Sequence, residues 1–258
     1  MAKQNLTIVK PTEVTAPAPG FLKAHGGGRG VSHDAADNIV PLIYVLQALS
    51  PQVNKAKPDF IPGSEAGDIW MRNSVPPIVK GEAGLLFQPC YFYKDWIEWI
   101  PRAKGGGYQG RHDARPDDAK EKPDAENPKR SRWMRPNGNE VIETRYHAGF
   151  VLLPGGTAAP YLIPMSGSGH TVSRNWMFMM NQKTMGGEVV DSWAGTYRLK
   201  TVSKTNAAGT WYTWAITDAG WVATEADYKR GEALFNSFKS GDKVAEAPAN
   251  VEADDDTM

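Results

Sequence analysis

The sequence predicts a mainly β protein with two helices, arranged as a small Greek-key barrel with helical additions. Apolar segments alternate with period two, turn residues separate them, and only two segments have helical spacing. The chain of 258 residues is long enough to bury a core without disulfides or structural metals. We expect a flexible N-terminal arm (1–34), one β-rich domain (35–243) and a disordered acidic C-terminal tail (244–258).

The N-terminal part begins with a segment that cannot bury enough apolar surface to order itself. Residues 1–34 are rich in Pro, Thr, Ala and Gly, which predicts a flexible arm. Asp37–Ser50 is apolar and β-branched, and Pro41 within it favours an edge strand over a helix. A short strand follows at Ile69–Arg72, and an irregular link leads to Leu85.

The most aromatic segment, Leu85–Ile100, predicts a strand with residues to bury or to bind on both faces. Period two places one set of side chains on one face: Tyr91, Tyr93, Ile97 and Trp99. The other face receives Phe92, Lys94, Trp96 and Ile100. Residues 101–140 then lose almost all hydrophobicity and predict a long polar insertion, with a glycine-rich loop at 105–107.

A β-hairpin and a helix are expected next. Arg145–Leu153 and Tyr161–Met165 flank the turn PGGTAAP and predict two apolar strands. Thr171–Lys183 has helical spacing, with Thr171 as the expected N-cap.

The C-terminal third predicts a strand pair and a last helix. Gly195–Lys204 and Thr210–Thr217 alternate with period two around the turn TNAAG. Thr224 and Asp227, three residues later, resemble a capping box and predict the start of a last helix. Gly241 is expected to end this helix.

The charge balance hides an asymmetry. The chain has 29 basic and 29 acidic residues, but residues 244–258 hold five acids and no base. The remaining 243 residues therefore carry a net charge of +5, which suits an anionic partner. Cys90 is the only cysteine, and the five histidines lack metal-ligand spacing, so no disulfide, metal or cofactor is expected. Without an apolar span or a secretory signal, we expect a cytoplasmic protein that does not enter a membrane.

The strand pair at 195–217 carries the clearest binding pattern. Arg198, Lys200 and Lys204 fall on one face, opposite the face that holds Tyr197 and Leu199. Trp211 on the partner strand is expected beside this basic row. Aromatic side chains next to cations bind single strands by stacking and by phosphate neutralisation. The alternative is a solvated strand with ordinary lysines.

Two further segments repeat the combination of aromatic and basic residues. Tyr91, Tyr93 and Trp99 lead into Arg102, Lys104, Tyr108 and Arg111. The loop SGSGH ahead of a helix offers backbone amides to a phosphate, with Arg174 in the first turn. The alternative for Trp96 and Trp99 is simple burial in the core.

Enzyme signatures are mostly missing from the sequence, so we expect a protein that is not an enzyme. Neither a phosphate-binding P-loop nor a dinucleotide fingerprint is present. Ser166 and Ser168 do not have the spacing of a nucleophile elbow, and Cys90 in an apolar strand is expected to be packed. The segment RHDARPDDAK resembles nuclease carboxylate clusters but lies in the polar insertion, without a strand to hold a metal.

The tail EADDDTM, together with the layout from Lys183 through the strand pair to Trp214, resembles single-stranded DNA-binding proteins of tailed-phage replication and recombination clusters. The resemblance implies an OB-like β-barrel that coats exposed strands. It also implies a tail that recruits replication or recombination proteins and competes with DNA. The tail positions are Asp254, Asp255, Asp256 and Met258. Met258 stands where the family usually has an aromatic residue, which puts partner docking in question.

The sequence leaves two other classes open. A phage virion structural or assembly protein would use exposed aromatics and extended termini to pack against neighbouring subunits. A carbohydrate-binding module would use Trp96, Trp99 and Trp211 as sugar platforms. DNA versus RNA preference and homo-oligomer formation stay open as well.

Overall fold

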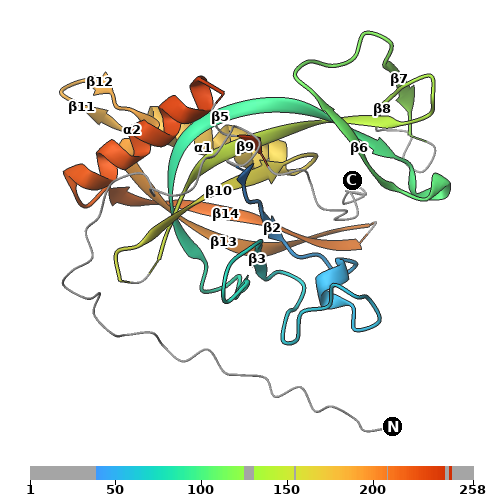
Figure 1. The fold of residues 1–258 in the computed structure, drawn as a ribbon, viewed down its shortest axis with the longest axis horizontal. Coiled ribbons are helices and arrows are strands. Elements are labelled where there is room, and N and C mark those ends of the chain that lie inside the picture. Colours follow the sequence, from blue (N-terminus) through green and yellow to red (C-terminus); the bar gives the residue numbers. More distant parts are fainter. Residues whose placement is uncertain (1–38, 125–130, 154, 208, 242–243, 246–258) are drawn as a thin grey trace, which may run out of the picture. The chain divides into compact units, whose positions relative to one another are not determined.

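A computed structural model of the chain describes residues 39–124, 131–153, 155–207, 209–241 and 244–245 (Figure 1). Within these ranges the protein is mainly β with two α-helices, as the sequence predicts. The expected N-terminal arm (1–34) and acidic residues 246–258 lie outside the described residues. No helix in the described part of the chain is long and apolar enough to cross a membrane.

The helices are α1 (Gly169–Asn181) and α2 (Glu225–Lys239), with short 3-10 turns η1 (Pro51–Val53), η2 (Arg102–Lys104) and η3 (Ser192–Ala194). The strands before residue 140 are β1 (Ile39–Val40), β2 (Ile43–Val45), β3 (Ile69–Met71), β4 (Ile78–Val79), β5 (Leu85–Ile100), β6 (Gly107–His112), β7 (Lys120–Pro123) and β8 (Ser131–Met134). The later strands are β9 (Glu140–Leu152), β10 (Ala158–Met165), β11 (Thr184–Met185), β12 (Glu188–Val189), β13 (Gly195–Asn206), β14 (Gly209–Trp221) and β15 (Val244–Ala245).

The central feature is the long antiparallel ribbon of β5 and β9, which arches across the view in Figure 1. The edge of β5 that faces away from β9 is shared by two strands. β13 pairs with its first residues, 85–87, and β6 pairs with its last, 96–100. On the far edge of β9, β10 pairs with 145–152 and β8 with 140–141. The ribbon therefore joins a proximal sheet (β14, β13, β5, β9, β10) to a distal sheet (β6, β5, β9, β8, β7).

The sheets are open in the described residues, so the expected OB-like Greek-key barrel is not confirmed. β10 does not pair with β14 in the described residues; Leu162 of β10 forms an isolated parallel bridge with Leu42, the residue just before β2. Gln47, two residues after β2, links this segment to β14: its side-chain amide donates to the Tyr212 carbonyl (2.8 Å) and accepts from the Tyr212 N–H (2.9 Å). This side-chain contact stands where a closed barrel would have a continuous backbone ladder.

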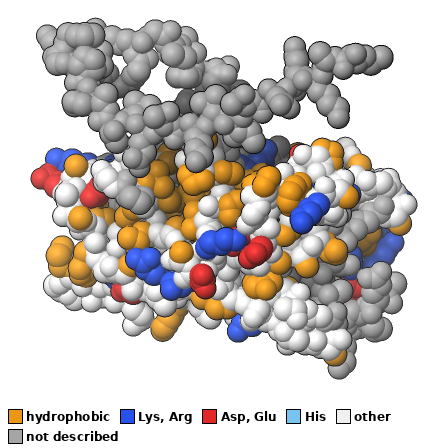
Figure 2. Space-filling model, turned by 90° about the horizontal axis from the view of Figure 1, so that it is seen from below, with side chains coloured by type: hydrophobic (Ala, Val, Ile, Leu, Met, Phe, Trp, Pro, Cys, Tyr) orange, Lys and Arg blue, Asp and Glu red, His pale blue; other side chains and the backbone are white. Residues whose placement is uncertain are grey.

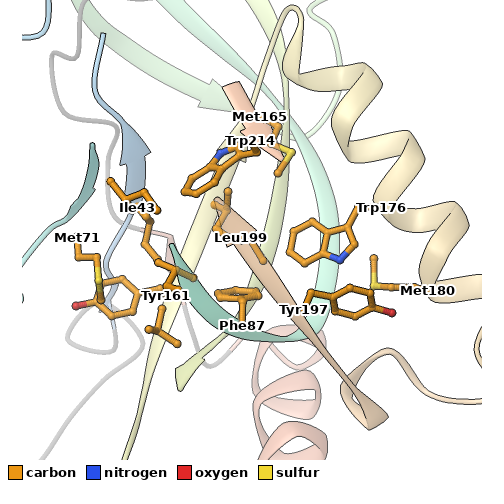
Figure 3. Packing of buried hydrophobic residues seen from close by; sticks show 14 residues of the cluster. Ile43, Met71, Phe87, Tyr161, Met165, Trp176, Met180, Tyr197, Leu199 and Trp214 are labelled. Carbon is orange, nitrogen blue, oxygen red and sulfur yellow. The ribbon is translucent and has the colours of Figure 1, made fainter. Parts of the chain in front are cut away.

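The main core lies between the proximal sheet and α1. Figure 3 shows Trp176 of α1 beside Phe87 and Tyr197, with ring centroids 5.8 and 5.7 Å away. Leu199 and Trp214 fill the layer from β13 and β14, and both are buried. The core also contains Ile43, Ile69, Met71, Leu85, Val151, Tyr161, Ile163, Met165 and Met180.

Helix α2 covers the opposite side of the sheet, and its start is as predicted. The Thr224 hydroxyl oxygen accepts from the Asp227 N–H (3.1 Å), and the Asp227 carboxylate accepts from the Thr224 hydroxyl (2.8 Å). Gly241, with φ of +81°, follows its end. Leu234 of α2 packs in a second cluster with Cys90, Phe150 and Trp193. Cys90 is buried, as expected, and burial raises the pKa of its thiol.

Three local predictions need correction. The polar insertion at 101–140 does contain strands: it includes β6, β7 and β8, which paired charges rather than an apolar core hold in place. The predicted link before Leu85 contains β4. Helix α1 begins at Gly169, two residues before Thr171, and no side chain caps it. The early strands are short because Pro41 separates β1 from β2.

Candidate nucleic-acid interface

The β13–β14 hairpin has the geometry that the sequence predicts. Tyr197 and Leu199 are fully buried, whereas Arg198, Lys200 and Lys204 are exposed. Within the described part of the chain, none of these three cations forms an ion pair. Trp211 lies directly across from Lys204 in the antiparallel ladder, so the two side chains share the exposed face. The hairpin therefore presents a row of free positive charge that ends beside a half-buried indole.

The second predicted group, on β5, is partly covered by α2. The Tyr91 ring stacks on Phe238 at 5.8 Å, and Tyr93 stacks on Tyr146 at 5.0 Å. Burial raises the pKa of Tyr93, so its hydroxyl stays neutral. Tyr91 and Tyr93 thus have internal packing partners while remaining half-buried.

The end of β5 and the start of β6 carry the rest of this group. The rings of Trp99 and Tyr108 meet edge to face, 6.1 Å apart, and both are half-buried. The Arg111 guanidinium lies 3.5 Å from the Asp95 carboxylate. Lys104, in η2, donates to the Asn137 carbonyl at 3.0 Å and is exposed. Arg102 belongs to the same 3-10 turn, and its side chain lies outside the described part of the structure.

Strand alternation places these two groups on one side of the sheet. Arg198 of β13 lies opposite Leu86 of β5, so the two side chains share one face of the sheet. Gln88 is the next β5 side chain on this face. It donates to the Trp193 and Asp227 carbonyls, which places this face beneath α2. After the bulge at 89–91, Tyr91 continues on this α2 side. The cationic row of β13 and the aromatics of β5 and β6 therefore flank α2. Arg174 is apart from them, because it belongs to α1 on the other side, where it donates to the Thr171 hydroxyl oxygen (3.2 Å).

The face seen from below relative to Figure 1 combines apolar and basic groups (Figure 2). Hydrophobic side chains gather at its centre, and Lys, Arg, Asp and Glu side chains lie among them. β13, β14 and β3 lie toward this side in Figure 1. Charges of both signs therefore lie beside the apolar centre of this face.

A buried carboxylate fixes the distal sheet. Glu98 is 4% exposed, and its two oxygens accept four hydrogen bonds. The donors are Asn139 (2.7 Å), Arg135 (2.7 Å), His112 (2.8 Å) and Asn137 (3.2 Å). Although burial favours the protonated acid, these donors outweigh it and lower the pKa of Glu98 to about 2. The negative charge therefore persists at neutral pH and ties β5 to β6 and to the segment between β8 and β9.

Sequence reasoning missed a cluster on the α1 side of the distal sheet. The guanidinium carbon of Arg115 lies 3.7 Å from the centre of the Trp133 ring and 5.8 Å from that of Trp96. The two indoles meet edge to face at 6.4 Å. The available signal was Trp133 between Arg132 and Arg135 in a segment otherwise almost free of apolar residues.

The described residues contain no group of three or more His, Cys, Asp or Glu side chains that could hold a metal ion. Ser173 and His147 form a close serine–histidine pair (2.9 Å), which is buried beneath α1. Burial, reinforced by Arg145, lowers the pKa of His147 to about 3, so the imidazole is neutral. This hydrogen-bonded pair therefore stabilises the packing of the core and is not accessible to a substrate.

A family model described as Pam3 phage gp34-like protein matches residues 11–244. The chain belongs to this family. The sequence-based expectation of a bacteriophage protein is thereby confirmed. The comparison with curated proteins and the comparison with solved structures each found no match.

Proposed function

We propose that this phage protein binds single-stranded DNA without sequence preference and protects or presents it during replication or recombination. The observation that carries the proposal is the β13 row of Arg198, Lys200 and Lys204, exposed and without ion pairs among the described residues, with Trp211 opposite Lys204. Cations that lack carboxylate partners keep their full charge for phosphates, and an adjacent indole offers a stacking surface of about 1–3 kcal/mol per base.

The order of strands supports an OB-like arrangement. β5, β9 and β10 form a meander, α1 follows, and β13 returns to β5 before turning into β14. OB-folds are partly open Greek-key barrels that bind oligonucleotides with the loops between strands 1 and 2 and between strands 4 and 5. The corresponding loops here are the segment that carries β6–β8 and the β13–β14 turn. Both adjoin the residues that the sequence singles out.

The position of the C-terminal strand supports a role for the acidic tail. β15 pairs in parallel with β1, and Val40 of β1 belongs to the same cluster as Tyr93, Trp99 and Tyr108. The acidic residues begin at Glu246, directly after β15. A tethered polyanion that starts here competes with DNA for the binding face and is available to partner proteins when DNA displaces it.

The test is a tryptophan fluorescence titration with oligo(dT) at several salt concentrations, compared with duplex DNA. We expect R198A/K200A to weaken binding and to reduce the slope of log K against log salt by about 1.4, since each phosphate contact contributes about 0.7 on single strands. The matched control is K55A/K57A, which removes two exposed charges from the loop after η1. Equal slopes for both double variants would remove the hairpin from the binding site. A chain that binds no single strand at all would favour a virion component instead.

A further inference from the structure

We infer that Arg115, Trp96 and Trp133 form a second nucleotide-binding platform, on the α1 side of the distal sheet. We call these three residues the Arg115 platform. This inference rests on the proposed function and extends it, because the single strand would continue around the edge of the distal sheet. The ligand class is a nucleotide unit of the strand, with its phosphate on Arg115 and its base on the exposed part of Trp96.

The side chain of Arg115 is available to bind an anion. It is exposed, it lies in the irregular segment after β6, and it forms no ion pair within the described ranges. The guanidinium carbon lies 3.7 Å from the centre of the Trp133 ring, and this cation–π contact restrains the side chain while it stays exposed. Such an arginine loses little side-chain freedom on binding, and its planar fork matches the geometry of a phosphate.

The contrast with neighbouring arginines makes Arg115 distinct. Arg132 contacts Asp124 at 2.7 Å and Glu140 at 3.1 Å. Arg135 contacts Glu98 at 2.7 Å and Asp118 at 2.9 Å. Arg132 and Arg135 thus form ion pairs within the protein and stabilise the distal sheet. Arg115 alone among the three has an aromatic partner instead of a carboxylate.

The path of a strand follows from the edge position of β6. In the described residues, β6 pairs with β5 only, so its outer edge has no neighbouring strand. Arg111 lies opposite Ile97 on the α2 side, and His112 lies opposite Trp96 on the α1 side. Arg115 follows three residues later. A polynucleotide that leaves Tyr108 and Arg111 therefore reaches the Arg115 platform by crossing one strand.

The experiment uses the full chain with R115A, R115K and the control K57A in oligo(dT) titrations over a range of salt. We expect R115A to lower affinity about tenfold and to reduce the salt slope by about 0.7, the value for one lost phosphate contact on a single strand. R115K should keep the slope and lose part of the affinity, because an ammonium does not stack as a flat group. K57A should change neither quantity.

The outcomes separate the two proposals. If the unmodified chain binds oligo(dT) and R115A keeps the full salt slope, the Arg115 platform is overturned while the proposed function stands. If the unmodified chain does not bind, both fail together. Circular dichroism of each variant identifies loss of folding, and R115K then decides the question, since it retains the charge at the same position.

Discussion

Replacing Glu98 by glutamine tests whether a single buried carboxylate holds the distal sheet. The carboxylate is 4% exposed and accepts four hydrogen bonds, two on each oxygen. Glutamine keeps the shape but replaces one accepting oxygen by an amide that donates. Arg135 and His112 would then face an N–H group, and the favourable charge interaction with Arg135 would be lost.

The magnitude follows from the pKa of Glu98. Folding lowers it from 4.5 to about 2, and each unit corresponds to about 1.36 kcal/mol. The ionised carboxylate therefore contributes about 3 kcal/mol above pH 4.5, and this contribution disappears as the pH falls toward 2. We expect E98Q to lose at least this amount of unfolding free energy at pH 7.

The assay is urea denaturation of the unmodified chain and of E98Q at pH 7 and pH 3, monitored by tryptophan fluorescence. The gap between the two proteins should narrow at pH 3, because the unfolded chain protonates Glu98 below pH 4.5 while the folded carboxylate, with a pKa of about 2, is still mostly ionised. The control is E82Q, at an exposed carboxylate outside the distal sheet, for which we expect a change within about 0.5 kcal/mol. A loss below about 1 kcal/mol at pH 7, or a gap independent of pH, would refute this account of the Glu98 network.

Three other predictions concern the core, α2 and the tail. The unfolded chain protonates His147 below pH 6.5, whereas the folded chain does so only near pH 3. The free energy of unfolding should therefore fall by up to about 2 kcal/mol between pH 6.5 and pH 5. The variant H147Q should flatten this pH dependence in urea denaturation. G231A should destabilise by about 1–3 kcal/mol despite better helix propensity, because its Cβ would lie 2.5 Å from Cβ of Trp193; an unchanged urea midpoint would contradict the packing of α2. Deleting 246–258 should tighten oligo(dT) binding at low salt; equal affinity would exclude competition by the tail.

The candidate site was predicted in part because its central element depends on local geometry. In β13, Arg198 and Leu199 must point to opposite faces in any strand, so an alternating sequence specifies one apolar and one cationic face. The partner strand adds Trp211 to the cationic face because a short turn fixes the register of a hairpin. The role of these residues in binding DNA stays a prediction.

The distal sheet escaped prediction because its stability comes from contacts between residues far apart in the chain. Glu98 contacts Arg135 and Asn139, which lie 37 and 41 residues further along the chain, and a polar segment gives no apolar alternation to reveal such pairing. The Arg115 platform was missed for the same reason, since it joins the end of β6 to β8.

The sequence by itself determined the strand-rich composition, the two faces of the β13–β14 hairpin and the capped start of α2, because period-two alternation and capping act over a few neighbouring residues. Only the tertiary structure decided that β13 returns to β5, that the sheet stays open and that α2 lies between the cationic row and the aromatic residues. Those outcomes depend on which distant surfaces bury each other, and the pattern of a single segment does not contain that information.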